Sequence, residues 1–268
     1  MISIRTFAAA VVAFIMQYGT SAYAEDISTP VPKDSLTLTA ETQEFSRSSG
    51  SLRSVRIDYK KVIDDTTVMV TAAGGRRSSP NEVVSAAGGG VELYHKWNDT
   101  VSTHSTIFVS SNKPVFAKLD ISQDITATIA TNTTGAIGVR WAEYANGDKL
   151  LFLNAGTRYY FKRGSISYRL TYTKPNGRPG YLAHLANLAI NDQNGRGKTQ
   201  FWASYGSTVL ERSLLDGNFN GHDYGAVLRR VQPIGGIDLI LVGGVASYAN
   251  PAGRIWGKSV AFGLSLPL

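Results

Sequence analysis

The amino-acid sequence predicts an all-β protein: a single closed antiparallel transmembrane β-barrel of about 12–14 strands that follows a cleaved signal peptide. Three observations lead to this fold class. The first 24 residues have the composition of an export signal, apolar and polar residues alternate with period two from Ser35 onward, and no later segment is apolar enough for a spanning helix. A chain that crosses hydrocarbon without helices must close into a barrel, because only closure leaves every backbone group hydrogen-bonded.

The N-terminus carries the predicted export signal. Arg5 is the only charged residue before Glu25, an apolar stretch runs over 7–16, and Ala22-Tyr23-Ala24 places small residues at the cleavage positions. The apolar stretch is too short to cross a bilayer as a helix, and an N-terminal core helix would not need this order of features. We therefore predict cleavage after Ala24. The expected division of the chain is a signal peptide over 1–24, a periplasmic lead-in over 25–34 and an outer-membrane barrel over 35–268.

Composition narrows the classes of partner. The 268 residues carry a formal net charge of +7 and include no cysteine, so neither a disulfide framework nor a thiolate metal site is available. Basic residues are scattered through the predicted strands and form no compact block, which argues against nucleic acid. The basic balance would suit anionic lipid headgroups or an acidic polymer.

The strand pattern is clearest in the middle of the chain. Over 165–172 apolar residues occupy the even positions and polar residues the odd ones, and over 151–161 the odd positions are mostly apolar. Lys162-Arg163-Gly164 joins these two segments as a hairpin. Residues 137–142 alternate in the same way and precede the turn signal Asn146-Gly147-Asp148. These three segments predict a meander of antiparallel strands.

The same alternation predicts strands along the rest of the chain. The links between them vary in length, as short periplasmic turns and longer outer loops would. The remaining predicted strands lie near 36–40, 55–60, 66–75, 88–97, 102–111, 115–122, 181–190, 201–205, 223–231, 236–248 and 255–267, and the longer links lie at 76–81, 191–196 and 210–221.

A soluble β-sandwich would also give alternating strands, with the apolar face inside. Aromatic residues near the strand ends favour the barrel, because membrane-interface girdles place aromatics there. On the predicted outer face these are Tyr159, Phe161, Tyr168, Tyr172, Tyr181 and Tyr205.

The last predicted strand has one strongly apolar face. This face resembles the signal by which barrel-assembly machinery recognises outer-membrane proteins, so that machinery is an expected partner together with outer-membrane lipid. Such signals usually end in Phe or Trp, from which Pro267 and Leu268 depart. The residues of the predicted assembly signal are Trp256, Val260, Phe262, Leu264, Leu266 and Leu268.

Several segments resemble the YaiO family of outer-membrane β-barrel proteins. The likeness is best from about Ser110 to the C-terminus, through the runs 111–116, 153–161, 201–206 and 262–265. The resemblance implies an outer-membrane location. In members found beside polysaccharide glycosyltransferases and deacetylases, it also implies a part in exopolysaccharide export or in surface carbohydrate. It transfers no site residue to this sequence.

Charged residues on the polar face of the strands are predicted to point into the lumen, because charge on the lipid side costs a few kcal/mol near the midplane. They would form either a basic lumen that guides an anionic or hydroxyl-rich polymer, or a set of salt bridges that fills the barrel. The predicted lumen-facing residues are Arg56, Lys60, Lys118, Asp120, Arg140, Arg158 and Arg169, with Asp58 and Arg229 beside them.

Catalytic and nucleotide-binding signatures are absent from the sequence. The four histidines, His95, His104, His184 and His222, belong to no Gly-x-Ser-x-Gly or His-Glu-x-x-His motif, although the first two could meet across a hairpin. The glycine clusters at 74–75 and 88–90 lack the ending of a phosphate loop, and close strand packing is their expected use. We assign no catalytic residue, cofactor or metal.

These observations favour a noncatalytic outer-membrane barrel that assists export or surface display of an exopolysaccharide, with polysaccharide or its synthesis and export proteins as expected partners. Two alternatives stay open at this point. One is an outer-membrane enzyme that acts on lipid or glycan through a histidine and a serine, and the other is a plain porin-like or structural barrel.

Overall fold

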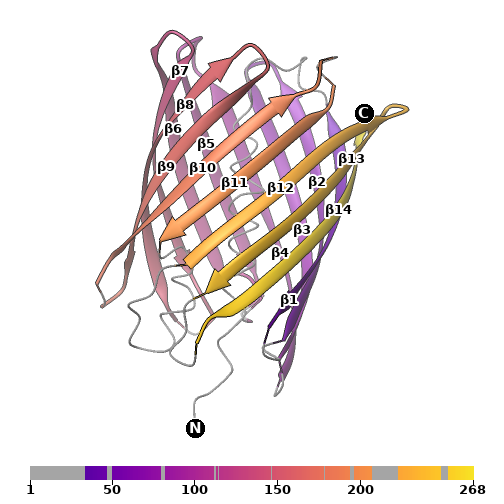
Figure 1. Ribbon diagram of the computed structural model, residues 1–268, viewed down its shortest axis with the longest axis vertical. Coiled ribbons are helices and arrows are strands. Elements are labelled where there is room, and N and C mark those ends of the chain that lie inside the picture. Colours follow the sequence, from indigo (N-terminus) through magenta and orange to yellow (C-terminus); the bar gives the residue numbers. More distant parts are fainter. Residues whose placement is uncertain are drawn as a thin grey trace.

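The computed structural model is a closed barrel in which every strand is antiparallel to its neighbours and β1 pairs with β14 (Figure 1). The structure describes residues 34–46, 50–79, 82–111, 113, 115–145, 147–177, 179–193, 196–206, 223–248 and 253–268. The predicted signal peptide, and all of the predicted lead-in except Asp34, lie outside these residues. The strands are β1 (Ser35–Phe45), β2 (Ser51–Ile63), β3 (Thr66–Ser79), β4 (Glu82–Lys96), β5 (Val101–Ser110), β6 (Leu119–Ala130), β7 (Thr133–Glu143), β8 (Lys149–Phe161), β9 (Gly164–Pro175), β10 (Tyr181–Asn191), β11 (Lys198–Gly206), β12 (Asp223–Ile234), β13 (Ile237–Tyr248) and β14 (Ile255–Pro267). The predicted fold class is confirmed, at the upper end of the expected strand number.

Alternating side chains explain why these segments form a barrel wall. On β8, Leu151 and Leu153 are exposed on the outside, while Leu150 and Phe152 are buried on the inside. The same alternation of exposed apolar and enclosed polar or small residues runs through β1, β2 and β14. An apolar outer surface is stable only against lipid, so the outer surface is the membrane-facing one.

One end of the barrel has the tighter turns. The links after β2, β6, β8 and β12 are two residues long, and Asp64 and Asn132 adopt positive φ angles of 50° and 57° in the first two. The start of β1 and the end of β14 lie at this same end, where Ser35 is opposite Pro267. The links at the other end are mostly longer, for example 111–118 and 144–148. Outer-membrane barrels have short turns on their periplasmic side and longer loops on the other.

Three details of the sequence prediction are wrong. β6 begins at Leu119, so the expected strand over 115–122 lacks its first half, and β3 continues to Ser79, which shortens the link expected at 76–81. Tyr181 is opposite Thr173, whose side chain is buried inside, and therefore does not belong to the outer aromatic set. The long link expected at 210–221 lies outside the described residues.

Within the described part of the chain, no helix is long and apolar enough to cross a membrane.

Candidate functional site

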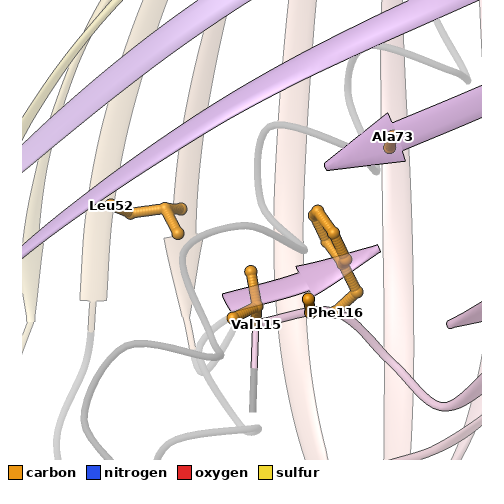
Figure 2. Packing of buried hydrophobic residues seen from close by; sticks show 5 residues of the cluster. Leu52, Ala73, Val115 and Phe116 are labelled. Atoms are coloured by element: carbon orange, nitrogen blue, oxygen red, sulfur yellow. The ribbon is translucent and has the colours of Figure 1, made fainter. Parts of the chain in front are cut away.

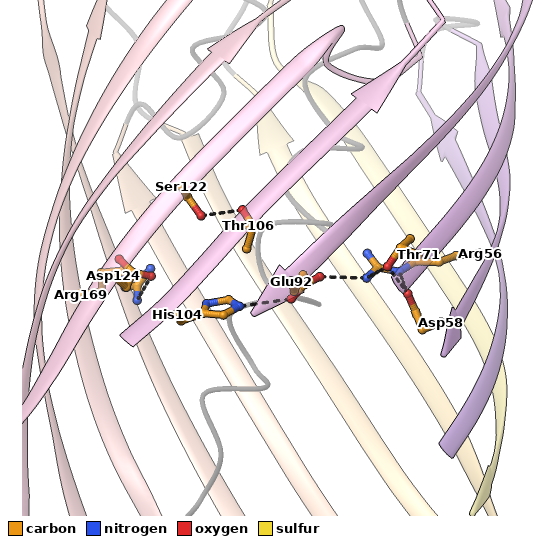
Figure 3. Close-up of polar contacts among 9 residues, drawn as sticks. All are labelled: Arg56, Asp58, Thr71, Glu92, His104, Thr106, Ser122, Asp124 and Arg169. Carbon is orange, nitrogen blue, oxygen red and sulfur yellow. Dashed lines mark hydrogen bonds and ion pairs between the residues drawn. The ribbon is translucent and has the colours of Figure 1, made fainter. Parts of the chain in front are cut away.

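The lumen wall carries a chain of polar contacts across β2 to β5 (Figure 3). Arg56 Nε donates to Asp58 Oδ1 at 2.6 Å, and Arg56 Nη2 lies 3.2 Å from Glu92 Oε1. His104 Nε2 lies 3.3 Å from the second oxygen of Glu92, while Thr71 Oγ1 donates to Asp58 at 2.6 Å. Because each strand contributes every second residue to the lumen, these side chains meet although they come from four different strands.

A second group of ion pairs continues the chain over β6 to β9. Arg140 holds Asp120 with two nitrogens, through Nε at 2.8 Å and Nη2 at 2.5 Å. This bidentate geometry is the strongest kind of arginine–carboxylate contact. Arg169 Nη2 lies 3.5 Å from Asp124 Oδ2, although β7 and β8 lie between their strands.

Gly138 makes room for the carboxylate of the long-range pair. It lies on the lumen side of β7 opposite Asp124, and a Cβ added there would overlap the Asp124 carboxylate. Gly156 on β8 is opposite Arg169, and a Cβ added there would lie 2.8 Å from the backbone oxygen of Tyr168. The absence of a side chain at Gly138 therefore leaves the space that Asp124 occupies in the ion pair.

The other predicted lumen residues have varied surroundings. The Arg158 guanidinium carbon is 6.0 Å from the centre of the Tyr160 ring, and Arg229 Nη1 donates to Gln200 Oε1 at 2.9 Å. Lys60 lies on the same side of β2 as Arg56 and Asp58. Lys118 differs, because it precedes β6 and its Nζ lies 2.8 Å from Glu143 Oε1 at the strand end. The expectation that Lys118 projects from a strand into the lumen is therefore wrong.

Apolar residues also enter the lumen, from the segment before β6. Val115 and Phe116 are almost completely buried, and they pack against Leu52, Ala73 and Ala86 on the inner wall (Figure 2). Gly75 leaves room for them on the inner wall, because a Cβ at this position would lie only 2.9 Å from atoms of both Val115 and Phe116. Val115 and Phe116 thus lie inside the barrel and narrow its long-loop half.

This inward segment connects two apolar clusters. Ala117 packs against the second cluster, which consists of Ala142, Tyr144, Leu150 and Phe152 on and beside β7 and β8. Arg140 links this cluster to the polar chain, since its guanidinium carbon lies 4.6 Å from the centre of the Phe152 ring. The lumen wall therefore combines charges, hydroxyl groups and aromatic faces.

The glycine cluster at 88–90 allows close packing, which is the use expected from the sequence. A Cβ at Gly88 would lie 2.6 Å from the Phe108 ring, and a Cβ at Gly90 would lie 2.9 Å from it. Phe108 in turn makes an edge contact with Phe116, with ring centres 6.0 Å apart. Gly88 and Gly90 thus accommodate the ring that supports the inward segment.

The histidines are dispersed over both faces of the barrel. His104 faces the lumen, whereas His95 accepts or donates a 2.8 Å hydrogen bond with Thr66 and packs against the exposed Trp97. His95 is opposite Thr103 and not His104, so the two do not meet across the hairpin. His184 contacts Tyr168 Oη on the outer face, and His222 lies outside the described residues. Among the residues that the structure describes, no three His, Asp or Glu side chains are grouped as metal ligands.

Sequence reasoning missed Glu92, Asp124 and the inward position of Val115 and Phe116. Glu92 could have been found, since it alternates with Gly88 and Gly90 in a segment with a weak strand pattern. The inward segment could not, because its partners on β2, β3 and β4 lie far away in the sequence.

The apolar face of β14 points outward. Trp256, Val260, Phe262, Leu264 and Leu266 are exposed on the membrane side, Leu268 is exposed just beyond the end of the strand, and the alternate residues Ser259 and Ala261 are buried on the lumen side. Their role as an assembly signal stays a prediction.

The closed wall, the apolar outer surface and the polar lumen define a β-barrel of the outer-membrane type. The barrel is similar to a bacterial polysaccharide outer membrane secretin, with a TM-score of 0.55 and 7% identity over 88% of this chain and 98% of that one. It is also similar to a TodX monoaromatic hydrocarbon channel mutant, with a TM-score of 0.55 and 7% identity over 87% of this chain and 89% of the other. At such identities the likeness shows the fold alone.

The chain belongs to the YaiO membrane beta barrel family, whose domain matches residues 33–210. The matched region begins just before β1 and ends after β11, so it includes the N-terminal strands. The resemblance read from the sequence was instead strongest from Ser110 to the C-terminus. Family membership therefore rests on the first eleven strands.

Proposed function

We propose that this protein is a noncatalytic outer-membrane barrel that assists the export or surface display of an extracellular polysaccharide, which contacts the lumen wall. The observation that carries the proposal is the band of paired charges, hydroxyl groups and amides across β2 to β9. Such a band offers donors and acceptors at short intervals, as a hydroxyl-rich chain requires.

The pairing of the charges bears on the kind of polymer. Arg56, Arg140 and Arg169 each contact a carboxylate, so their positive charge is locally balanced. A lumen with balanced charges attracts an acidic polymer less strongly than a basic lumen would. It still offers its hydrogen-bonding groups. A neutral, hydroxyl-rich saccharide is therefore the favoured solute. The partly exposed ring of Tyr160, on the lumen side of β8, adds a surface on which a sugar ring can pack.

Two further observations support the proposal. The family resemblance implies a part in exopolysaccharide export for members found beside polysaccharide enzymes. One of the similar solved structures is named for polysaccharide, although its 7% identity makes it a parallel in fold only.

Conductance through planar bilayers tests the proposal. We expect a neutral oligosaccharide to reduce the ion current of the purified protein reversibly, and Arg140→Gln to weaken this block by roughly fivefold to tenfold, the effect of losing one charge-assisted hydrogen bond. A deletion strain should export less polymer. Open channels without any saccharide block, together with an unchanged polymer yield, would favour a plain porin and refute the proposal.

The enzyme alternative has a separate test. His104 is the one histidine among the described residues that faces the lumen beside a carboxylate, Glu92. If the barrel were a hydrolase, His104→Gln should abolish polymer processing while the protein still folds. We expect polymer length to stay unchanged in this variant and in His95→Gln and His184→Gln.

A further inference from the structure

Two arginines face the membrane directly opposite each other. Arg53 on β2 is the register partner of Arg76 on β3, and both side chains are exposed on the outer face. Like charges directly opposite in an antiparallel pair destabilise a sheet. Neither arginine makes a hydrogen bond or ion pair with another residue that the structure describes. Among the residues that the structure describes, no ion pair therefore compensates the repulsion between them.

The position of the pair along the strands indicates what could compensate it. Arg53 is the third residue of β2, so it lies about 7 Å from the long-loop end at 3.3–3.4 Å per residue. The next outward residues toward the short-turn end are Val55, Ile57 and Tyr59, which form the apolar band. Outward Thr42 and Ser85 flank the pair in register, at the same level of the wall. The pair thus lies where the hydrocarbon-facing surface ends and headgroups begin.

The local charge is positive even when nearby acids are counted. The neighbouring outward carboxylate is Glu44 on β1, which is opposite Lys258 on β14 and one outward position further toward the loops. Arg53, Arg76 and Lys258 together outnumber Glu44 by two charges. This patch suits an anionic headgroup that accepts several hydrogen bonds, and arginine pairs bind phosphate oxygens in this way.

The surface below the pair has room for a hydrocarbon chain. The outward residues there are Ala72 and Gly74 on β3 and Ala87 and Gly89 on β4, which are opposite each other in register. A Cβ added at Gly74 would meet no atom within 4 Å, so the surface is open at this point. An acyl chain can therefore lie against β3 and β4 directly beneath a headgroup held by the arginines.

We propose that Arg53 and Arg76 bind the phosphate group of a lipid in the membrane leaflet at the long-loop end. The phosphate lies between the two guanidinium groups and removes their mutual repulsion. One acyl chain packs over Ala72, Gly74, Ala87 and Gly89. This lipid site is on the outside of the barrel and is independent of any polymer in the lumen.

Native mass spectrometry in dodecyl maltoside, a phosphate-free detergent, with added phosphatidic acid tests the proposal. We expect the wild-type protein to retain the lipid, and the double variant Arg53→Gln/Arg76→Gln to bind it about 25-fold more weakly, at roughly fivefold per arginine near a membrane surface. Arg254→Gln is the matched control. Its guanidinium lies at the same end but is already stacked on Tyr224, 4.8 Å from the ring centre, and bonded to Ser247. Equal losses in the control and the double variant would overturn the proposal.

Thermal unfolding of Arg53→Gln gives a second readout that does not depend on lipid retention. Without phosphate lipid the substitution should raise the unfolding temperature, because it removes the repulsion. With phosphatidic acid it should lower the unfolding temperature relative to wild type. A decrease under both conditions would mean a purely structural role and would refute the proposal. Full competition by the same concentration of inorganic phosphate would also refute it, since the site would then bind free phosphate and not a lipid.

Discussion

At the scale of single residues, the lumen depends as much on missing side chains as on charged ones. Gly138 gives space to the carboxylate of the Asp124–Arg169 ion pair, and Gly88 and Gly90 give space to the Phe108 ring. Alternation in the sequence predicted the side on which Arg56, Arg140 and Arg169 lie. It could not predict most of their partners, because Glu92, Asp120 and Asp124 lie on strands other than those of the arginines they contact.

Substitution at Gly138 tests this dependence. Gly138→Ala should displace the Asp124 carboxylate and destabilise the barrel by about 1–3 kcal/mol, the usual cost of overpacking. Urea unfolding in detergent micelles measures the loss. Gly243→Ala is the matched control, since a Cβ at Gly243 would meet nothing within 4 Å. If both variants unfold alike, the space at Gly138 has no part in the ion pair.

At the scale of elements, strands with strong alternation were predicted well and the link before β6 was not. In β8 and β9 the outward residues are apolar and the inward ones are mostly polar or small, so a period of two specifies both the strand and its faces. Val115 and Ala117 also alternate with their neighbours, yet Val115 and the adjacent Phe116 are both buried. Successive side chains of a strand in the barrel wall point to opposite faces, so a strand could not bury both of them inside. The segment is therefore not part of the wall.

The inward segment should control the width of the lumen. Phe116→Ala removes a ring that packs against Leu52, Ala73 and Ala86, which should cost about 3–5 kcal/mol if the site behaves as a protein core. It should also raise single-channel conductance, because the ring occupies lumen space.

Phe161→Ala is the control for this experiment. Phe161 is exposed on the outer face, so its removal should leave conductance unchanged. Identical conductance in wild type and Phe116→Ala would show that the segment does not narrow the conducting path.

At the scale of the whole molecule, β1 and β14 close the ring along the full length of β1, and Asp34 adds contacts at the short-turn end of this ladder. Asp34 accepts a 2.5 Å hydrogen bond from Lys61 Nζ and a 2.9 Å bond from the amide of Val62, while its carbonyl accepts one from Leu268 N. The contact with Lys61 lowers the pKa of the Asp34 carboxyl below its usual value. Asp34 thus connects the start of β1 with both strands that flank it.

The stabilisation that the Asp34 carboxylate provides should be lost in acid. A carboxyl whose pKa is lowered by folding stabilises the folded state above its unfolded pKa, about 3.9, and the stabilisation is lost as the pH falls through the lower folded value. We expect the unfolding temperature of the wild type to fall below about pH 4, and Asp34→Asn to reduce that fall. Thermal scans from neutral pH to about pH 2 measure both. Equal slopes for the two proteins would exclude a contribution from Asp34.

Closure at β1 and β14 also has a consequence for the time course of folding. Thr37 donates a hydrogen bond to Ser265 across a sequence separation of 228 residues, and the whole β1–β14 ladder joins segments equally remote. Contacts between residues so far apart in the sequence form slowly, because the entropic cost of closing the intervening loop opposes them until the ladder is complete. Until that moment both β1 and β14 present unpaired edges, which readily join other chains. The nascent barrel therefore needs protection of these two edges for longer than any single hairpin takes to form.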